Sequence, residues 1–220
     1  MKTVFITGAN RGIGLEMAKQ FSQKGVQVIA ACRNSSPELD QLNIQVETHY
    51  DVADADSVRQ LAEKFKQQKI DILINNAGIL DSMGLGDLNY DSMRRQFEIN
   101  ALGPLRVSQS FLPNLDKGSK IVIITSRMGS MQDNTSGGQY GYRMSKAAVN
   151  MVGRSLAEDL KQKEIAVALL HPGYVRTEMT AGNGLINADE SARGLIQRID
   201  ELNMHNTGGF WHTDGTKLPW

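Results

Sequence analysis

Short apolar runs alternate along the chain with longer segments whose apolar residues recur at helical spacing. The runs are rich in Val, Ile and Leu, and they comprise Lys2–Thr7, Val26–Ala31, Ile44–Tyr50, Ile70–Asn75, Ser119–Thr125 and Ile165–His171. Nearly continuous apolar runs of this length are typical of strands that are buried on both faces of a parallel sheet. The pattern therefore predicts at least these strands in one buried sheet.

The segments between the runs have the periodicity of amphipathic helices. Apolar residues recur at Val58, Leu61, Ala62 and Phe65, which places them on one helical face. A longer helix is predicted over Tyr140–Lys163, where small and apolar pairs recur every four residues. Strands that alternate with helices predict a single α/β domain over residues 1–220. We expect a Rossmann-type, doubly wound parallel sheet of about seven strands in a three-layer α/β/α arrangement.

Three longer irregular stretches interrupt this alternation, at residues 34–43, 129–138 and 177–187. Loops of this length within a compact domain usually carry function or move. The last two come soon after the fifth and sixth predicted strands, whose carboxyl ends border the ligand crevice of such a sheet. We therefore expect residues 129–138 and 177–187 to form the substrate loops.

The charge balance and the cysteine count argue against several classes of protein. The chain has 24 Lys and Arg residues against 24 Asp and Glu residues, so it lacks the basic excess with which proteins bind nucleic acid. The single cysteine, Cys32, has no partner for an intrachain disulfide, which favours a reducing, cytoplasmic location. The apolar stretch Val4–Ile6 is too short for a signal peptide, and no run approaches the roughly 20 apolar residues that span a bilayer. We expect neither nucleic acid nor a membrane as a partner.

A glycine-rich segment, Thr7–Gly14, follows the first predicted strand and precedes a helical pattern over Leu15–Lys24. Glycines in this position allow a tight turn and a close approach to a pyrophosphate, and the helix N-terminus directs N–H groups at the phosphates. The spacing G-x-x-x-G-x-G differs from the G-x-G-x-x-G of the usual dinucleotide fingerprint. Its place between a strand and a helix still favours a nucleotide-binding turn over an ordinary connection.

Residues at the end of the second predicted strand indicate which dinucleotide binds. An NAD-binding protein places an acidic residue there, which hydrogen-bonds to the ribose hydroxyls. This chain has Cys32 followed by Arg33, and Arg11 lies in the glycine-rich turn. Two guanidinium groups are suited to bind a 2′-phosphate. Both arginines could instead be ordinary surface charges, but that alternative does not explain why the acidic residue of NAD-binding proteins is absent. The sequence therefore predicts NADP(H) rather than NAD(H).

Tyr142 and Lys146 are one helical turn apart in the long predicted helix and therefore share a face. An ammonium group beside a phenol stabilises the phenolate and lowers a pKa that is ordinarily about 10, which suits a general acid or base. Taken alone, the pair also fits a surface tyrosine beside a lysine whose ammonium reaches solvent. Tyr140 is close by, but only Tyr142 has a lysine one turn later, so Tyr142 is the candidate acid or base of the two.

With several short motifs, this pair resembles the pattern of the classical short-chain dehydrogenase/reductases along nearly the whole chain. The motifs occur in the order of that family: Thr7–Gly14, Asp51-Val52, Asn75–Gly78, Asn100, Ser126, Tyr142 with Lys146, and Pro172-Gly173. Four segments resemble the branch of the C-factor and Sniffer-type carbonyl reductases: Ile124–Ser126, Tyr140–Lys146, Leu170–Gly173 and Gly208–Trp220. The resemblance implies a Rossmann fold and hydride transfer between a nicotinamide cofactor and a carbonyl or alcohol.

The resemblance also implies a role for each motif residue. Tyr142 would donate a proton to the carbonyl oxygen of the substrate, and Ser126 would hydrogen-bond to the same oxygen. Lys146 would bind the nicotinamide ribose and lower the pKa of Tyr142, and Asn100 would position a water that relays protons to Lys146. Apart from Tyr142 and Lys146, the cofactor-binding residues would be Gly8, Asn10, Arg11, Gly12, Ile13, Gly14, Arg33, Asp51, Val52, Asn76, Ala77, Gly78, Pro172, Gly173, Val175 and Thr177.

Ser130 is a rival for the serine role, because the segment between Ser126 and Tyr142 is about three residues longer than in the common family pattern. We expect Ser126, because it directly follows the fifth strand, where side chains face the crevice. His171, at the end of the sixth strand, is expected to be a buried, hydrogen-bonded residue rather than a base. The histidines and Cys32 lack metal-ligand spacing, so the sequence predicts no metal site.

Two functions fit this pattern. The first is an NADPH-dependent reductase of small aldehydes, ketones or quinones with Tyr142 as general acid. The second, suggested by the C-factor likeness, is a cofactor-binding signalling or regulatory protein whose turnover is incidental. Asn100, Ser126, Tyr142 and Lys146 together favour the enzyme, since a binding module has no need of that combination. The family likeness also suggests a homodimer or homotetramer through the long central helices, although some carbonyl reductases of the family are monomers.

Overall fold

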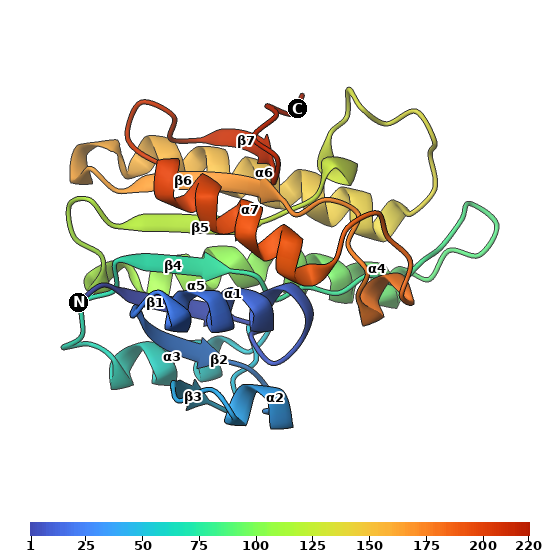
Figure 1. Ribbon diagram of the computed structural model, residues 1–220. Coiled ribbons are helices and arrows are strands. Elements are labelled where there is room, and N and C mark those ends of the chain that lie inside the picture. Colours follow the sequence, from blue (N-terminus) through green and yellow to red (C-terminus); the bar gives the residue numbers. More distant parts are fainter.

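The computed structural model describes residues 1–220 and is built around one sheet of seven parallel strands (Figure 1). Across the sheet the strands follow the order β3-β2-β1-β4-β5-β6-β7. Their bounds are β1 Thr3–Thr7, β2 Gln27–Ala31, β3 Gln45–Glu47, β4 Ile72–Asn75, β5 Lys120–Ile124, β6 Ala166–His171 and β7 Gly209–His212. The order reverses direction between β1 and β4, as in a doubly wound sheet, so the predicted fold class is confirmed.

Helices cover both faces of the sheet. Their bounds are α1 Gly12–Gln23, α2 Pro37–Asp40, α3 Ala55–Lys64, α4 Tyr90–Phe97, α5 Gly103–Ser110, α6 Tyr140–Asp159 and α7 Ala188–Glu201. A π-helical segment at Glu98–Leu102 joins α4 to α5, and short 3₁₀ turns occupy Leu112–Asn114, Arg127–Gly129, Lys161–Lys163 and Glu178–Thr180. In Figure 1, α1 and α7 lie in front of the sheet, while α5 and α6 lie behind it.

The alternation of side chains along each strand produces two core layers, one on each face of the sheet. In β1, Phe5 belongs to a cluster of 23 buried apolar residues that includes residues of α3, α5 and α6. Its neighbours Val4 and Ile6 belong to a second cluster of 22, which includes residues of α1 and α7. Because successive side chains of a strand point to opposite faces, an unbroken apolar run is what a sheet covered on both sides requires.

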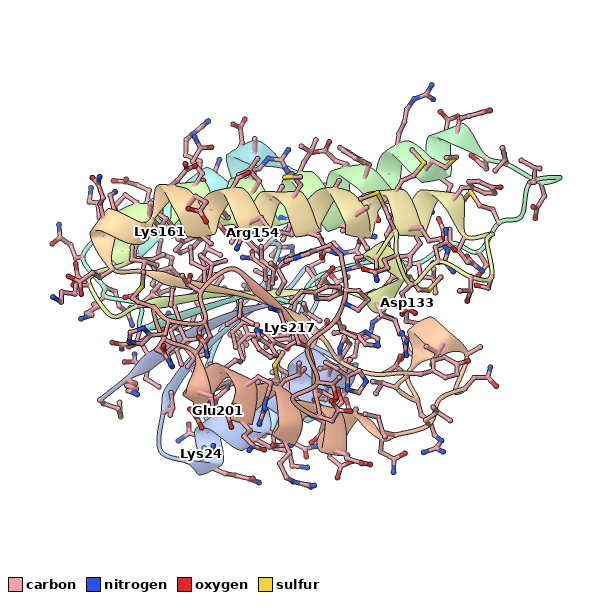
Figure 2. The ribbon with its side chains drawn as sticks, turned by 90° about the horizontal axis from the view of Figure 1, so that it is seen from above. Lys24, Asp133, Arg154, Lys161, Glu201 and Lys217 are labelled. Carbon is pink, nitrogen blue, oxygen red and sulfur yellow. The ribbon has the colours of Figure 1, made fainter.

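Charged side chains occupy the outer surface of these layers. In the view of Figure 2, Arg154 and Lys161 mark the side of α6, and Lys24 and Glu201 mark the ends of α1 and α7 on the opposite side of the sheet. The ion pair of Lys24 with Asp200 joins the ends of α1 and α7 and is largely exposed, so it contributes little to stability. No helix is long and apolar enough to cross a membrane.

The structure corrects the predicted element bounds in three places. The third strand covers only Gln45–Glu47 and is shorter than predicted; the φ of +60° at His49 interrupts the extended backbone. The predicted helix Tyr140–Lys163 ends at Asp159 and is followed by a tighter 3₁₀ turn. A seventh strand was expected but not located: β7 corresponds to none of the six predicted runs, since its short sequence lacks a run of β-branched residues.

Candidate active site

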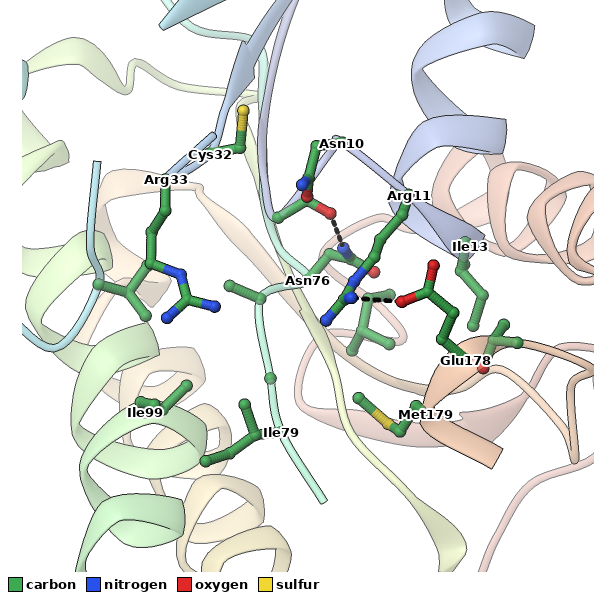
Figure 3. Close-up of a pocket in the computed structure, with 18 of the residues that line it drawn as sticks. Asn10, Arg11, Ile13, Cys32, Arg33, Asn76, Ile79, Ile99, Glu178 and Met179 are labelled. Atoms are coloured by element: carbon green, nitrogen blue, oxygen red, sulfur yellow. Dashed lines mark hydrogen bonds and ion pairs between the residues drawn. The ribbon is translucent and has the colours of Figure 1, made fainter. Parts of the chain in front are cut away.

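A crevice of about 350 Å³ opens at the carboxyl ends of β1 and β4, where the strand order reverses (Figure 3). This is the place at which open α/β sheets bind their ligands. The walls come from segments far apart in the sequence, which include the glycine-rich turn, the ends of β2 and β4, helix α6 and the segment after β6. Most of the predicted cofactor-binding residues therefore lie around one crevice.

The glycine-rich turn leaves no room for side chains at two of its positions. Gly8 has a φ of +67°, and a Cβ there would lie 2.9 Å from the Cα of Ala77. A Cβ on Gly14 would overlap the main-chain oxygen of Gly8. The side chain of Asn76 fixes the turn from the other side, because its Nδ2 donates to the main-chain oxygens of Thr7 and Gly8, both at 3.0 Å. The main chain of the turn is thus fixed at the edge of the crevice without side chains at Gly8 and Gly14. A pyrophosphate requires such a close approach to the backbone.

The end of β2 presents a cation to the crevice and no acid. Arg33 is exposed, and its guanidinium makes no ion pair and no hydrogen bond within the chain. Cys32 is buried, and burial raises the pKa of its thiol, which keeps it protonated. On the neighbouring wall, Asp51 uses one carboxylate oxygen to accept the N–H of Ala53 at 2.9 Å. The end of the crevice next to β2 therefore contains an unpartnered guanidinium beside a neutral thiol.

Arg11 also lines the crevice, but its guanidinium is already engaged. In Figure 3 the Arg11 side chain reaches from the glycine-rich turn to the carboxylate of Glu178, with which it forms an ion pair. Glu178 lies in the segment after β6, within one of the predicted substrate loops. The predicted convergence of Arg11 and Arg33 is therefore only partly observed: both side chains border one crevice, while Arg11 contacts Glu178.

Tyr142 and Lys146 lie on the buried face of α6, with 9% and 5% of their surfaces exposed. The Nζ of Lys146 lies 5.6 Å from the centre of the Tyr142 ring. Burial raises the pKa of Tyr142 to about 12, although a hydrogen bond with Ser126 acts in the opposite direction. The predicted lowering of this pKa by Lys146 is not found here: burial has the largest effect, and the charge of Lys146 does not contribute to the shift.

Burial has the opposite effect on Lys146 and lowers its pKa to about 8, because a charged ammonium is poorly solvated here. Its Nζ donates to the main-chain oxygen of Ile124, at the end of β5, at 3.0 Å. An ammonium has three N–H donors, so this bond leaves two without a protein acceptor. The pocket-facing donors of Lys146 are available to a ligand hydroxyl.

Asn100 lies in the π-helical segment Glu98–Leu102 and points into the interior. Its Oδ1 accepts the N–H of Ile79 at 2.9 Å, and its Nδ2 donates to the oxygen of Ile79 at 2.8 Å and to Oγ of Ser145 at 3.0 Å. The wider π turn often occurs at functional sites, because it redirects one side chain. Asn100 thereby joins the segment after β4 to helix α6 at Ser145, the residue that precedes Lys146.

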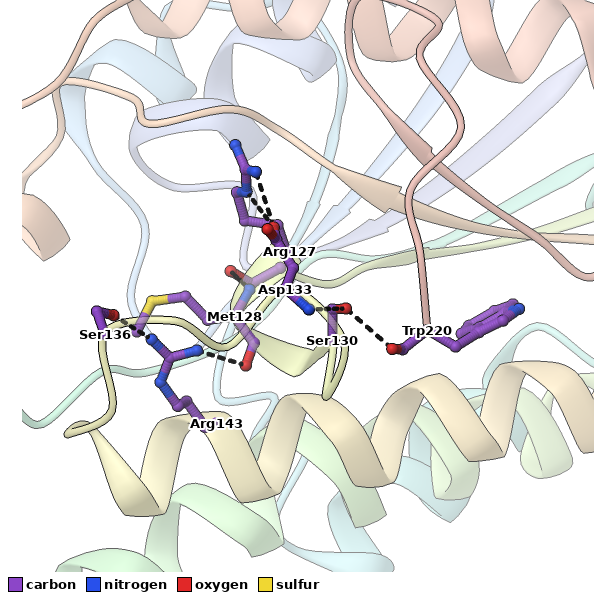
Figure 4. A network of polar contacts seen from close by, with 8 residues as sticks. Arg127, Met128, Ser130, Asp133, Ser136, Arg143 and Trp220 are labelled. Carbon is purple, nitrogen blue, oxygen red and sulfur yellow. Dashed lines mark hydrogen bonds and ion pairs between the residues drawn. The ribbon is translucent and has the colours of Figure 1, made fainter.

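The two candidate serines have different partners. Ser126 lies two residues after the end of β5. Its hydroxyl accepts the N–H of Met128 at 3.1 Å and forms a hydrogen bond with the side chain of Tyr142. The hydroxyl of Ser130 instead donates to the main-chain oxygen of Trp220 at 3.0 Å and accepts the N–H of Asp133 at 3.0 Å (Figure 4). The structure therefore places Ser126 beside the tyrosine and engages Ser130 in holding the loop.

Two arginines fix the loop that follows Ser126, as Figure 4 shows. Arg127 pairs with Asp133 at 2.7 Å within the loop. Arg143, the residue after Tyr142, donates to Oγ of Ser136 at 2.8 Å and to the main-chain oxygens of Gly137 and Met128 at 3.3 and 3.4 Å. The predicted substrate loop is thus attached to the helix that carries Tyr142 and Lys146.

The segment after β6 contributes only part of what the sequence predicted. Pro172 and Thr177 line the crevice, whereas Gly173 and Val175 do not. Lining residues that were not predicted include Ile79, Thr125, Glu178 and Met179. Each of them is a sequence neighbour of a predicted residue or of another residue of this set. Their position next to the motifs is therefore the signal by which the sequence could have identified them. No sequence signal linked Glu178 to Arg11, because the two residues are 167 positions apart.

His171 is the last residue of β6 and directly precedes the same segment. It is buried, and its ring lies 5.0 Å from that of His212. Burial, followed by the charge of His212, lowers the pKa of His171 to about 3. Its Nδ1 has no hydrogen-bond partner in the chain, so the sequence-based expectation of a buried residue is confirmed but that of a hydrogen-bonded side chain is not.

Comparison with known protein sequences agrees with this geometry. A family model for short chain dehydrogenases matches residues 2–185. The 1-hydroxy-2-glutathionyl-2-methyl-3-butene dehydrogenase of Rhodococcus sp. (strain AD45) is 43% identical over 226 residues, which cover all of both chains. The C-signal protein of Myxococcus xanthus is 47% identical over 154 residues, which cover 69% of this chain and 93% of that one.

Solved structures give the same result. The carbonyl reductase Sniffer of D. melanogaster superposes with a TM-score of 0.94 at 30% identity, with all of both chains covered. The NADPH-bound carbonyl reductase from chicken fatty liver superposes with a TM-score of 0.90 at 30% identity, with 100% of this chain and 99% of that chain covered. The chain therefore belongs to the short-chain dehydrogenase/reductase family of oxidoreductases, and within it to the classical members of the C-signal and Sniffer type.

Proposed function

We propose that the protein is an NADPH-dependent reductase of small aldehydes, ketones or quinones, with Tyr142 as the general acid. The observation that carries this proposal is the pairing of Tyr142 with Lys146 on the crevice side of α6, beside Ser126. A phenol with a raised pKa is protonated at neutral pH, which is the state that a proton donor in carbonyl reduction needs.

The crevice has the features that a nicotinamide dinucleotide requires. The turn at Gly8 and Gly14 has no space for side chains, as expected where a pyrophosphate approaches a backbone and a helix N-terminus. We infer that Arg33, together with Arg11, binds the 2′-phosphate, because both guanidinium groups line the crevice and the end of β2 carries no acid. Asp51 and the Asn76–Gly78 segment would then hold the adenosine, and Pro172 and Thr177 the nicotinamide end.

The bound cofactor supplies the hydride, and the protein supplies orientation and the proton. Tyr142 donates its hydroxyl proton to the substrate carbonyl oxygen, which gains negative charge as the hydride arrives. Ser126 donates a hydrogen bond to the same oxygen and so stabilises that charge. Lys146 would hold the ribose of the cofactor with its free N–H donors, and its positive charge would stabilise the tyrosinate that remains.

Similar proteins support this assignment. The chicken fatty liver protein is a carbonyl reductase with NADPH bound. The Rhodococcus relative is named for oxidation of a hydroxyl compound that carries a glutathionyl group. Carbonyl reduction and alcohol oxidation are the two directions of one reaction, so both names agree with the roles given to Tyr142 and Ser126.

A spectrophotometric screen tests the proposal. NADPH oxidation is followed with a panel of aldehydes, ketones and quinones, and the Kd values of NADPH and NADH are measured alongside. We expect turnover with several compounds and tighter binding of NADPH than of NADH. Tighter binding of NADH would contradict the assignment of Arg11 and Arg33.

The likeness to the C-signal protein supports a second candidate, a cofactor-binding signalling or regulatory role. This role requires the crevice but not the proton donor. The same screen separates the two functions, because NADPH binding without turnover on any compound would favour the regulatory role. The presence of both Tyr142 and Lys146 at the crevice favours the enzyme.

We also propose that the protein forms a homo-oligomer through its long central helices. Three large apolar side chains there are exposed in the single chain: Phe97 at the end of α4, Leu105 in α5 and Met151 in α6. Burial of such side chains against a second copy would remove apolar surface from water. Sedimentation equilibrium decides between a monomer and an oligomer.

A further inference from the structure

The glycine-rich turn and the segment after β6 touch each other at the mouth of the crevice. Arg11 and Glu178 form the ion pair that crosses it, and Figure 3 shows the two side chains meeting end to end. A Cβ on Gly12 would lie 3.4 Å from Cγ2 of Thr177, so the neighbouring backbone positions are also close. The ion pair therefore belongs to a contact between two walls of the same crevice.

The two arginines assigned to the phosphate differ in what they contact. Arg33 has no protein partner, whereas Arg11 is paired with the Glu178 carboxylate. A carboxylate and a phosphate offer a guanidinium the same kind of acceptor oxygens, so they compete for it. With 62% and 73% of their side-chain surfaces exposed, Arg11 and Glu178 form a weak pair that a dianionic phosphate is able to displace.

We propose that Glu178 is a residue that sets cofactor specificity: it holds Arg11 before the cofactor binds and competes with the 2′-phosphate for that guanidinium. The inference rests on the proposed use of NADP(H). Glu178 lowers the affinity for NADPH, which carries the 2′-phosphate, without changing the affinity for NADH. It therefore weakens the preference for NADPH that Arg11 and Arg33 create.

The alternative arrangement has the opposite consequence for binding. If the ion pair remained closed across a bound dinucleotide, Glu178 would stabilise the complex with either cofactor. Removal of the carboxylate would then weaken NADPH and NADH alike. The two arrangements therefore predict opposite changes in cofactor affinity when the carboxylate is removed. Competition predicts tighter binding of NADPH alone, whereas a closed ion pair predicts weaker binding of both cofactors.

The test is a double-mutant cycle read with both cofactors. Kd values for NADPH and NADH are measured by fluorescence titration for the wild type, Glu178→Gln, Arg11→Ala and the double variant. Glu190→Gln serves as the matched control, because Glu190 is an exposed acid at the start of α7 that makes no ion pair. The fragments 2′,5′-ADP and 5′-AMP, used as competitors, isolate the contribution of the phosphate from that of the nicotinamide.

We expect Glu178→Gln to bind NADPH and 2′,5′-ADP about two- to fivefold more tightly, the effect of removing one exposed ion pair. NADH and 5′-AMP should bind as they do to the wild type, and Glu190→Gln should change none of the values. In the Arg11→Ala background the effect of Glu178→Gln should vanish, because the two residues act through each other.

Two outcomes would overturn the inference, and they are separable from a failure of the proposed function. The first outcome is that Glu178→Gln binds NADPH as the wild type does, or binds NADPH and NADH equally more weakly. Glu178 would then have no role in the selection of NADPH over NADH, even if the wild type prefers NADPH. If the wild type bound NADH as tightly as NADPH, the proposed cofactor would itself be wrong and the inference would fall with it.

Discussion

At the scale of single residues, burial shifts the pKa values of Tyr142 and Lys146. The phenol and the ammonium of Lys146 are removed from water on the same helix face, and their pKa values move in opposite directions, to about 12 and about 8. From the sequence, only the spacing of the two residues was available, and it suggested that the charge of Lys146 would dominate. The depth of the site, which no local pattern encodes, changed the sign of the shift for Tyr142.

The two serines provide a prediction at this scale. Ser126→Ala should lower kcat by about a hundredfold, because it removes a donor to the oxygen that gains charge in the reaction. Ser130→Ala should leave kcat within about threefold but raise KM, because Ser130 holds the substrate loop to Trp220. Steady-state kinetics with saturating NADPH measures both constants. A large loss of kcat in Ser130→Ala alone would reverse the assignment.

At the scale of elements, the sequence predicted what depends on local pattern. Each β-branched run became a strand, because a strand covered on both faces needs an unbroken apolar run. The pattern missed β7, whose four residues form a strand only because they pair with β6. It also missed the π-helical turn at Asn100, because that turn depends on what the side chain contacts across the fold.

The two predicted substrate loops show the same limit. Residues 129–138 were predicted as a loop, but the contacts that fix it come from Arg143 and Trp220, at other places in the sequence. The pairing of Glu178 with Arg11 is also a tertiary contact. Motifs therefore located most of the crevice residues, whereas partners brought together by the fold could be found only in the structure.

The glycine-rich turn provides a prediction for an element. Gly8→Ala should lower the free energy of unfolding by about 1–3 kcal/mol, because alanine disfavours a positive φ and its Cβ would press on Ala77. The same variant should weaken NADPH binding, since the turn has to shift. Urea unfolding and cofactor titration measure the two effects.

Gly86→Ala is the matched control for this substitution. Gly86 lies in an exposed loop, a Cβ at this position would have no neighbouring atom within 4 Å, and the residue has no positive φ. Its replacement should change the free energy of unfolding by less than about 0.5 kcal/mol. Equal stability of Gly8→Ala and Gly86→Ala would contradict the described geometry of the turn.

At the scale of the whole molecule, stability in acid should depend on His171. Its pKa is about 3 in the folded chain, against 6.5 for an ordinary histidine. Between these values the unfolded chain binds more protons than the folded one, so stability rises with pH and is lost as pH falls from about 6.5 towards 3. Each pH unit in this window should cost about 1 kcal/mol of unfolding free energy from this residue alone.

His171→Asn should flatten that dependence, because the variant has no imidazole to protonate. Urea unfolding at several pH values between about 4 and about 7 gives the slope of the unfolding free energy against pH. The slopes of the variant and the wild type are compared, because the substitution can also change the absolute stability. His205→Asn, at an exposed position, is the control and should retain the wild-type slope. An unchanged slope in His171→Asn would show that this histidine is not held neutral by burial.

The sheet, the crevice and α6 together place Tyr142 beside Lys146 at the crevice, and the proposed mechanism makes this phenol the proton donor. The decisive comparison is therefore between the wild type and Tyr142→Phe, for which NADPH oxidation with a carbonyl substrate and the Kd of NADPH are measured on the same preparations. We predict that Tyr142→Phe loses turnover while it binds NADPH nearly as tightly as the wild type. A Tyr142→Phe variant that turned over at a rate close to that of the wild type would contradict the proposed mechanism.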